Sequence, residues 1–128
     1  MASIGIFRDE GILENVRAVE ESVLRPGLEE IAERHPSVGE VRGVGFMYAV
    51  ELVRSQETRE PLVPFNASGA AAGPMNEFAA AAKKGGLWPF VHFNRTHVVP
   101  PCTTTADEMR RGLEILDAAL QVADGFTH

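Results

Sequence analysis

The sequence predicts an α/β domain of the α+β type, in which a small, mostly antiparallel sheet of three to four strands packs against helices. One observation is the order of the local patterns, which runs helix, strands, helix, strands, helix. This order holds too few parallel crossovers for a wide sheet, so a small sheet covered on one face by helices is the economical arrangement. The chain has 128 residues, 45% of them hydrophobic. That is enough for one core, and residues 1–128 are expected to form a single domain.

The first element is a helix expected over Glu10 to His35. Apolar residues recur along it at spacings of three and four, which indicates one buried face. Pro26 interrupts the pattern, so a kink or break is predicted near Ser22 to Arg25, with Pro26 early in the second part. The apolar face consists of Ile12, Val16, Val19, Val23, Leu24, Leu28 and Ile31.

The stretch from Val38 to Val53 predicts two strands or one bent strand. It is rich in β-branched and aromatic residues, and its side chains alternate in character along the chain. Gly43 and Gly45 are expected at bulges or turns. The alternation sets Tyr48, Val50 and Leu52 against Met47, Ala49 and Glu51.

A surface loop and a short helix are expected next. The segment from Arg54 to Gly73 is polar, then broken by prolines, then rich in small residues, which favours a loop over the surface. Pro74 is suited to the start of a helix that runs to Lys84 with Phe78 as its main apolar anchor. Gly85 then suits a left-handed helix cap.

The last third of the chain predicts two extended segments and a closing helix. The segments "LWPFVHFN" and "THVVPP" contain β-branched and aromatic residues, and the second must end at Pro100 and Pro101, which donate no hydrogen bond to a sheet. Thr105 is placed to cap a helix that runs from Glu108 to Ala123. The double proline is therefore a rigid corner between strand and helix.

Composition excludes several classes of partner. The formal net charge is −6 and the pI is near 5.2, with 12 Lys and Arg spread along the chain. Nucleic acid and anionic membrane surfaces are therefore not expected as partners. One cysteine, no apolar stretch of membrane-spanning length and no basic-then-apolar N-terminus together favour a reducing, cytoplasmic setting.

Few residues suggest chemistry by themselves. Cys102 and His97 are the elements of a cysteine-dependent hydrolase, but no regular geometry brings them together across the proline corner. The histidines are scattered, so no metal site is expected. Gly39, Gly43 and Gly45 do not follow a strand into a helix with the spacing of a phosphate loop, and they suit strand bends instead.

Four segments together carry a resemblance to a known family. They are "EGILENV", "VGEVRGVGFMYAVELV", "TREPLVPF" and "GGLWPFVHFNRTHVVPPCTTTADEMRRGLEIL". Their order and spacing resemble the C-terminal small domain of class III aminotransferases, the pyridoxal-phosphate (PLP) enzymes of fold type I. The resemblance covers nearly the whole chain, and its most specific part pairs "VRGVGFMYAVEL" with "VVPPCTTTADEM".

The resemblance implies a cofactor whose binding machinery is not expected here. A PLP enzyme needs a lysine for the Schiff base, an acid for the pyridine nitrogen and a phosphate cup. The only lysines are Lys83 and Lys84, at an expected helix end, where the helix dipole explains them. No catalytic, cofactor-binding or metal-binding residue is therefore assigned. Together with the abrupt opening "MASIGIFRDEG", this leads us to expect a fragment that lacks the large PLP-binding domain and is inactive alone.

The resemblance also implies a substrate-facing segment between "GL" and the double proline. The family often places an arginine there to hold the substrate carboxylate; in a gap-free comparison that position falls on Phe90, and the nearest arginine is Arg95. Arg95 is either this ligand or an exposed turn residue, while Arg42 resembles the "VRG" arginine that ties the domain together or to its neighbour. The substrate-binding candidates are Arg95, Trp88, Phe90, His92 and Asn94, of which the last four share one side of an extended segment or equally serve a core.

The expected function is transfer of an amino group from an ω-amino acid or similar amine to a keto acid such as pyruvate. The expected partners are the large domain of the same enzyme and a second copy in a homodimer. An alternative is a stand-alone binding or oligomerisation module that has the same fold and no catalysis.

Overall fold

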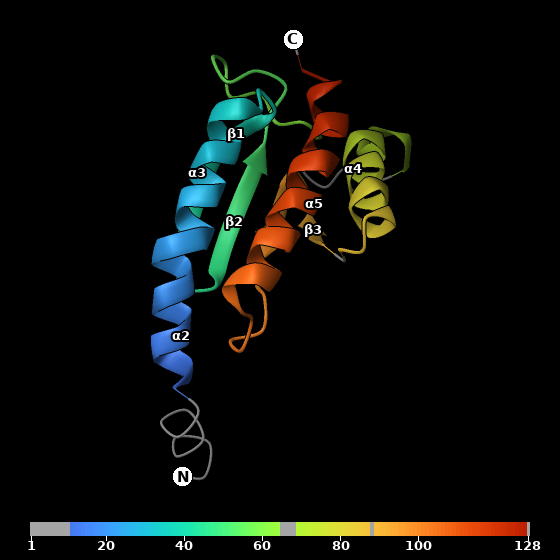
Figure 1. Cartoon of the computed structure of the whole chain (residues 1–128). Coiled ribbons are helices and arrows are strands. Elements are labelled where there is room, and N and C mark those ends of the chain that lie inside the picture. Colours follow the sequence, from blue (N-terminus) through green and yellow to red (C-terminus); the bar gives the residue numbers. More distant parts are fainter. Residues whose placement is uncertain (1–10, 65–68, 88, 128) are drawn as a thin grey trace.

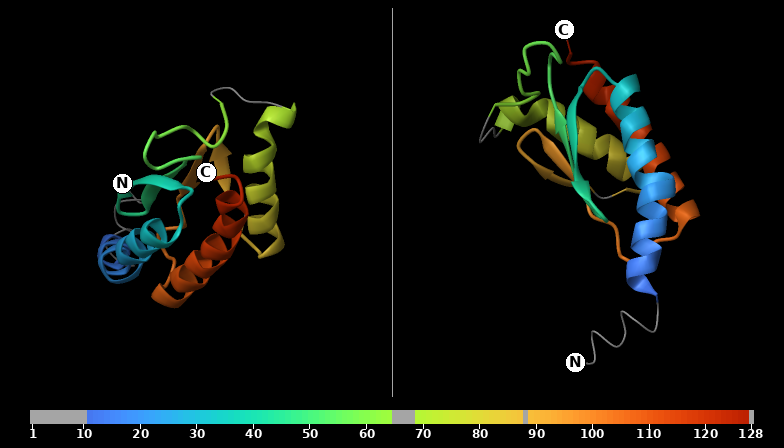
Figure 2. Two further views of the ribbon diagram at one scale, coloured as in Figure 1. Left: turned by 90° about the horizontal axis from the view of Figure 1, so that it is seen from above. Right: turned by 90° about the vertical axis from the view of Figure 1, so that its left-hand side faces the viewer.

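The computed structural model describes residues 11–64, 69–87 and 89–127. Within these ranges, four antiparallel strands form one sheet in the order β1-β2-β4-β3. Helices α3 and α5 lie side by side on one face of this sheet (Figures 1 and 2). The predicted α+β class, with a small antiparallel sheet packed against helices, is confirmed.

The first described element is one long helical rod with a local change of winding. It comprises α2 (Ile12–Val19), a π-helical segment η1 (Glu20–Leu24) and α3 (Arg25–Arg34). The amide of Arg25 donates to the carbonyl of Glu20, five residues earlier, because the turn widens just before Pro26, which has no amide hydrogen. The irregularity expected near Ser22 to Arg25 is thus a π-segment within a continuous rod, and Glu10 lies outside the described residues.

The next segment forms a hairpin of β1 (Val38–Val44) and β2 (Met47–Leu52). Gly45 turns the chain with φ of 61°. Gly43 has φ of 154°, and a Cβ there would lie 2.1 Å from the carbonyl oxygen of Met47. Glycine is therefore required at both positions. The register irregularity itself lies between Val38 and Glu40, not at Gly43.

The second hairpin consists of β3 (Phe90–His92) and β4 (Arg95–Val98), and β4 pairs with β2. Phe93 turns the chain with φ of 55°. The segment "LWPFVHFN", expected to be extended throughout, therefore ends its strand at His92, because the short hairpin leaves residues 93 and 94 for the turn.

Two further helices complete the fold. A 3-10 turn η2 (Gly69–Ala72) leads into α4 (Gly73–Lys84), and α5 (Ala106–Asp124) closes the chain. The left-handed cap expected at Gly85 lies one residue later, since Gly85 is helical with φ of −76° and Gly86 has φ of 103°. The amides of Gly86 and Leu87 donate to the carbonyls of Lys83 and Ala82, which is a Schellman motif.

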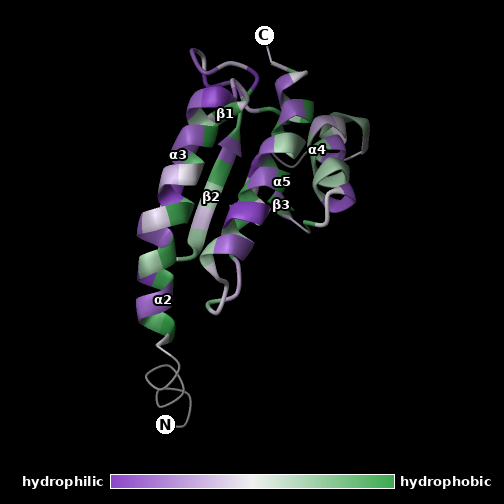
Figure 3. Cartoon of the chain, viewed as in Figure 1, coloured by the Kyte–Doolittle hydropathy of each residue, from purple (hydrophilic) through white to green (hydrophobic). Residues whose placement is uncertain are grey.

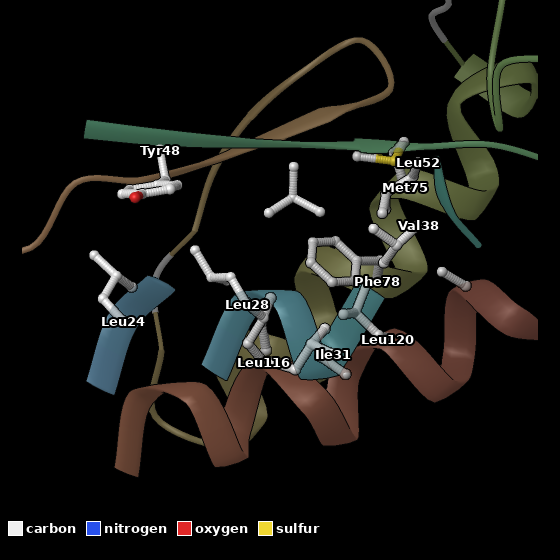
Figure 4. Packing of buried hydrophobic residues seen from close by; sticks show 14 of the residues in the cluster. Leu24, Leu28, Ile31, Val38, Tyr48, Leu52, Met75, Phe78, Leu116 and Leu120 are labelled. Atoms are coloured by element: carbon white, nitrogen blue, oxygen red, sulfur yellow. The ribbon is translucent and has the colours of Figure 1, made fainter. Parts of the chain in front are cut away.

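The core lies between the sheet and the helices (Figure 4). The inward row of β2 meets the apolar faces of α3 and α5, on which hydrophobic and hydrophilic stretches alternate in Figure 3. Leu62 and Val63 belong to this core with 0% and 1% exposure, so the loop after β2 does not run only over the surface as expected. Its apolar pair folds inward because an isolated bridge joins Val53 to Pro61. The central buried side chains are Leu24, Leu28, Ile31, Tyr48, Val50, Leu52, Phe78, Leu116 and Leu120.

Candidate functional site

Among the described residues, one face of the sheet carries no helix against it (Figure 2), and we call it the open sheet face. Strand pairing aligns Val41, Val50, Thr96 and Val91 in one row, and Val50 and Thr96 are 0% and 1% exposed, so this row faces the core. Since successive side chains in a strand point to opposite faces, the two neighbouring rows point away from the core, and so does the pair Val44 and Met47 near the hairpin turn. The open sheet face consists of Glu40, Arg42, Val44, Met47, Ala49, Glu51, Phe90, His92, Arg95 and His97.

Apolar side chains on this face are exposed to an unusual degree. Val44 is 71% exposed, Met47 69% and Phe90 65%, and Val99 beyond the end of β4 is 60% exposed. Most large apolar side chains elsewhere in the described residues are buried. Clustered exposed apolar groups on one face are typical of a surface that contacts another molecule or domain.

Arg95 and His92 come together at one end of the open sheet face. Arg95 is the first residue of β4, paired in register with His92 of β3 on one side and Glu51 of β2 on the other. The Arg95 Nη2 lies 3.3 Å from His92 Nδ1 in an exposed contact, and Arg95 as a whole residue is half-buried. Strand pairing therefore holds Arg95 in place, whereas a residue of a free turn would be mobile.

Phe90 and His97 form the neighbouring pair on the same face. Their ring centroids are 5.3 Å apart, and the rings meet edge to face at 66°. They occupy paired positions on β3 and β4, in the row next to that of His92 and Arg95. The second hairpin thus places two aromatic rings beside one guanidinium, a combination suited to an acidic ligand with an apolar body.

Asn94 and Trp88 are the two remaining predicted substrate ligands. Asn94 lies in the turn, where its Nδ2 donates to the carbonyl of Leu52 at 3.0 Å and its own carbonyl accepts from the Leu52 amide at 2.7 Å. Its amide group therefore fastens the hairpin to β2, and it does not continue the side shared by Phe90 and His92. Trp88 lies outside the described residues.

Arg42 is engaged within the sheet. Its Nη1 lies 3.0 Å from Glu40 Oε2 and its Nη2 lies 3.1 Å from Glu51 Oε1. The pair with Glu51 joins β1 to β2 on the open sheet face, whereas Glu40 lies in β1 itself. The geometry agrees with the expectation that this arginine ties the domain together.

The proline corner borders a cavity of about 340 Å³ between the second hairpin and the first turns of α5. His97 lines it together with Phe90, Pro100 and Pro101. Cys102 is exposed beyond the corner, and its backbone carbonyl accepts a hydrogen bond from Asn15 Nδ2 at 2.9 Å. In the described part of the chain the ring contact of His97 is with Phe90, and no hydrogen bond joins it to the thiol, so the geometry does not favour a cysteine–histidine pair.

Two buried polar clusters were not predicted from the sequence. In one, Glu20 accepts hydrogen bonds from Tyr48 Oη at 2.8 Å and from Arg25 Nη2 at 2.7 Å. Burial raises the pKa of Glu20, but the hydrogen bonds from Tyr48, Arg25 and the Gly45 backbone outweigh it and hold the pKa below its ordinary value. The other cluster surrounds His35. Each cluster joins residues that lie far apart in the sequence, Tyr48 to Glu20 in one and His35 to Asp117 and Asp124 in the other, and the only signal was a polar residue on an otherwise buried face.

Other kinds of site find no support in the residues that the structure describes. No group of histidine, cysteine and carboxylate side chains among them is arranged to hold a metal ion. No helix among them is long and apolar enough to cross a membrane. Lys83 and Lys84 are both exposed at the end of α4.

Comparison with known proteins gives the same class of protein as the fold. Residues 1–120 match the family model described as aminotransferase class III. The chain is 31% identical over 119 residues to the 5-aminovalerate aminotransferase DavT of Pseudomonas aeruginosa, covering 91% of this chain and 26% of that protein. It is 31% identical over 115 residues to a taurine–pyruvate aminotransferase of Bilophila wadsworthia, covering 84% of this chain and 23% of that protein.

A solved structure extends the likeness to three dimensions. The taurine:2-oxoglutarate aminotransferase of Bifidobacterium kashiwanohense, in complex with PLP and glutamate, superimposes with a TM-score of 0.87 at 27% identity. The match covers 97% of this chain and 27% of that chain.

Fold, motifs and matches together point to the aminotransferases as the class of protein. The chain belongs to the class III aminotransferase family. It spans about a quarter of the length of the curated relatives that it matches.

Proposed function

We propose that this chain is the C-terminal small domain of a PLP-dependent class III transaminase, and that its open sheet face forms one wall of the substrate site. The observation that carries the proposal is the open sheet face itself, where exposed apolar side chains adjoin the positioned pair of Arg95 and His92. A surface of this composition suits contact with a large domain across a substrate. The family membership and the share of each relative that the chain spans support the same reading.

The complete protein is proposed to move an amino group from an ω-amino acid or similar amine to a keto acid such as pyruvate. The relatives' names support this choice, since they specify 5-aminovalerate as one substrate and the taurine–pyruvate pair as another. Each of these amines carries an acid group at the end opposite the nitrogen. The substrate site therefore requires a fixed cation to hold that acid group.

Arg95 is proposed as that cation. A guanidinium can hold a carboxylate or sulfonate by two parallel hydrogen bonds, and pairing of β4 with both neighbouring strands fixes its position. Next to it, His92 orients the guanidinium, and Phe90 provides an apolar wall for the substrate chain. Trp88 remains a predicted contributor to the same wall, whereas Asn94 fastens the hairpin to β2.

The residues described here do not fit a PLP site. When bound, the cofactor supplies an electron sink for the carbon that bears the amino group, and it needs a desolvated lysine. Lys83 and Lys84 are exposed at the end of α4. We infer that the cofactor lysine and phosphate cup belong to a large domain outside this chain, in a cytoplasmic homodimer.

The test is to express the complete reading frame that contains this chain and to supply pyruvate with 5-aminovalerate, taurine or a simple amine. The proposal predicts that alanine forms with the acidic donors and that added PLP restores activity to the cofactor-stripped protein. If the reading frame encodes no further domain and no donor yields alanine, the alternative of a non-catalytic binding or oligomerisation module replaces the proposal.

A further inference from the structure

The buried cluster around His35 has no part in the proposed substrate site. His35 is 5% exposed and lies at the corner between α3 and β1. Its Nδ1 contacts Asp124 Oδ2, and its Nε2 lies 2.7 Å from Asp117 Oδ1. Asp124 Oδ1 also accepts from the Ser37 hydroxyl at 2.6 Å and from the Ser37 amide at 3.2 Å. Both ring nitrogens of one histidine thus face carboxylates.

This arrangement requires a proton on each ring nitrogen. A neutral imidazole donates from one nitrogen only, and its other nitrogen would then direct a lone pair at a carboxylate oxygen. The charged ring donates to both carboxylates, and hydrogen bonds between charged groups are the strong ones. The geometry therefore selects the imidazolium.

The directions of helices α3 and α5 also favour a positive charge at His35. Helices α3 and α5 run in the same direction, so their C-terminal ends lie at the same end of the molecule (Figure 1). Each C-terminal end carries a partial negative charge, and α5 has no basic residue in its last turn, where Asp124 adds a full negative charge. His35 directly follows α3 and contacts the last turn of α5, so one cation serves both ends.

We propose that His35 is a pH-sensitive clasp that holds the C-terminal end of α5 against the corner between α3 and β1 while its ring is protonated, and releases that end when the ring gives its second proton to water. Asp117 and Asp124 are 26% and 23% exposed, so water reaches the cluster from the α5 side. The charged and polar groups around it are Glu30 and Arg34 of α3, Ser37, Arg54 and Gln56 of the adjoining loops, and Asp117 and Asp124 of α5.

The direction of the pH response follows from the two protonation states. Burial by itself lowers the pKa of His35, but the hydrogen bonds and charges of Asp124 and Asp117 outweigh burial and raise the pKa above its ordinary value of 6.5. A raised histidine pKa means that the clasp stabilises the fold fully below 6.5 and is lost as the pH rises through the folded-state pKa. The α5 end therefore opens on the alkaline side.

The test measures two quantities on the unmodified chain. Nitrogen-15 NMR follows protonation of the His35 ring, and amide hydrogen exchange follows opening of the last turns of α5. The clasp predicts both ring nitrogens protonated at pH 6.5, and α5-end exchange that rises by about tenfold beyond the intrinsic base effect as the ring titrates. A His35 that titrates at or below the value of free histidine, or exchange that does not follow its titration, overturns the proposal.

Two variants separate the clasp from general loosening. Asp124→Asn keeps the shape of the side chain but removes its charge, and should lower the His35 pKa and shift the opening to lower pH. Asp107→Asn makes the same change at the opposite end of α5, where Asp107 pairs with Arg110, and should leave both measurements unchanged. Equal shifts in the two variants would contradict a local clasp.

Discussion

Arg95 illustrates how much of a residue's role depends on the strand that carries it. Its place between His92 and Glu51 in the sheet fixes the backbone of Arg95 and directs its side chain to the open sheet face. The sequence placed an arginine in this part of the chain but left open whether it was a turn residue. Strand pairing places Arg95 in β4 and not in the turn. Its binding of the substrate's acid group is a proposal.

Replacing Arg95 with lysine keeps the positive charge but removes the planar fork that can bind an acid group twice. In the complete enzyme, Arg95→Lys should weaken kcat/KM for donors with a carboxylate or sulfonate by about 2 to 4 kcal/mol if the site excludes water. Simple amines without an acid group should be affected far less. Steady-state kinetics with matched acidic and neutral donors measure the difference.

Arg110→Lys is the matched control, because Arg110 lies on the exposed side of α5, where its Nη1 lies 2.8 Å from Oδ1 of the nearby Asp107. Its effect should stay below about 0.5 kcal/mol for every donor. Equal losses for acidic and neutral donors in Arg95→Lys would remove Arg95 as the anchor.

Tyr48→Phe tests the buried cluster of Glu20. The variant removes the hydrogen bond that Tyr48 donates to the buried carboxylate of Glu20. It should therefore lower the free energy of unfolding at pH 7 by about 1 to 3 kcal/mol. The folded-state pKa of Glu20 lies below its ordinary 4.5, so this stabilisation is present above that value and is lost as the pH falls through the folded pKa. The difference between wild type and variant should therefore shrink in acid.

Urea unfolding at pH 7 and in acid measures that difference. Glu21→Gln, at the exposed neighbouring carboxylate, should change stability by less than about 0.5 kcal/mol. A Tyr48→Phe variant as stable as the wild type at pH 7 would show that the Glu20 cluster contributes little.

Helices and strands were the scale at which the sequence was most informative. Apolar residues at spacings of three and four predicted the helices, and the alternation of side chains around Tyr48 predicted which residues of β2 face the core. Both patterns arise because one face of each element is buried. The ends of the helices and strands were harder to predict. The cap at Gly86 and the turn at Phe93 depend on left-handed backbone conformations, and the type of a residue alone does not determine whether it adopts one. The His35 and Glu20 clusters depend on which elements become neighbours, which local patterns do not contain.

The start of α5 offers a test of local stabilisation. Thr105 Oγ1 accepts from the Glu108 amide at 3.2 Å, and Glu108 Oε1 accepts from the Thr105 amide at 3.1 Å, which is a capping box. Thr105→Ala should cost about 1 kcal/mol of unfolding free energy, and Thr105→Ser should recover most of it. Thr103→Ala, outside the box, serves as the control in the same urea titration. Equal stability of the Ala and Ser variants would argue against the cap.

At the scale of the whole molecule, the open sheet face should make the isolated chain self-associate. Its exposed apolar side chains bury area when two copies meet, as they would against a large domain. Light scattering over a range of concentrations should detect dimers or larger species. Met47→Lys and Phe90→Lys should shift them toward monomer, whereas Leu13→Lys, a change at a 71% exposed residue on α2, should not.

A strictly monomeric wild type at high concentration would count against a covered sheet face. Association that depends on Leu13 instead would place the contact on the helical rod. This surface could not be located from the sequence, because exposed apolar residues form a patch only when strands from different parts of the chain are aligned.

We propose that this chain supplies a substrate-facing sheet while another domain supplies the cofactor lysine. Incubation of the chain with PLP, reduction with borohydride and peptide mapping by mass spectrometry test it most directly. The expected result is only scattered, substoichiometric labelling of the exposed Lys83 and Lys84, and no transamination. Stoichiometric labelling of one of these lysines, with alanine formed from pyruvate and an amine donor, would contradict it.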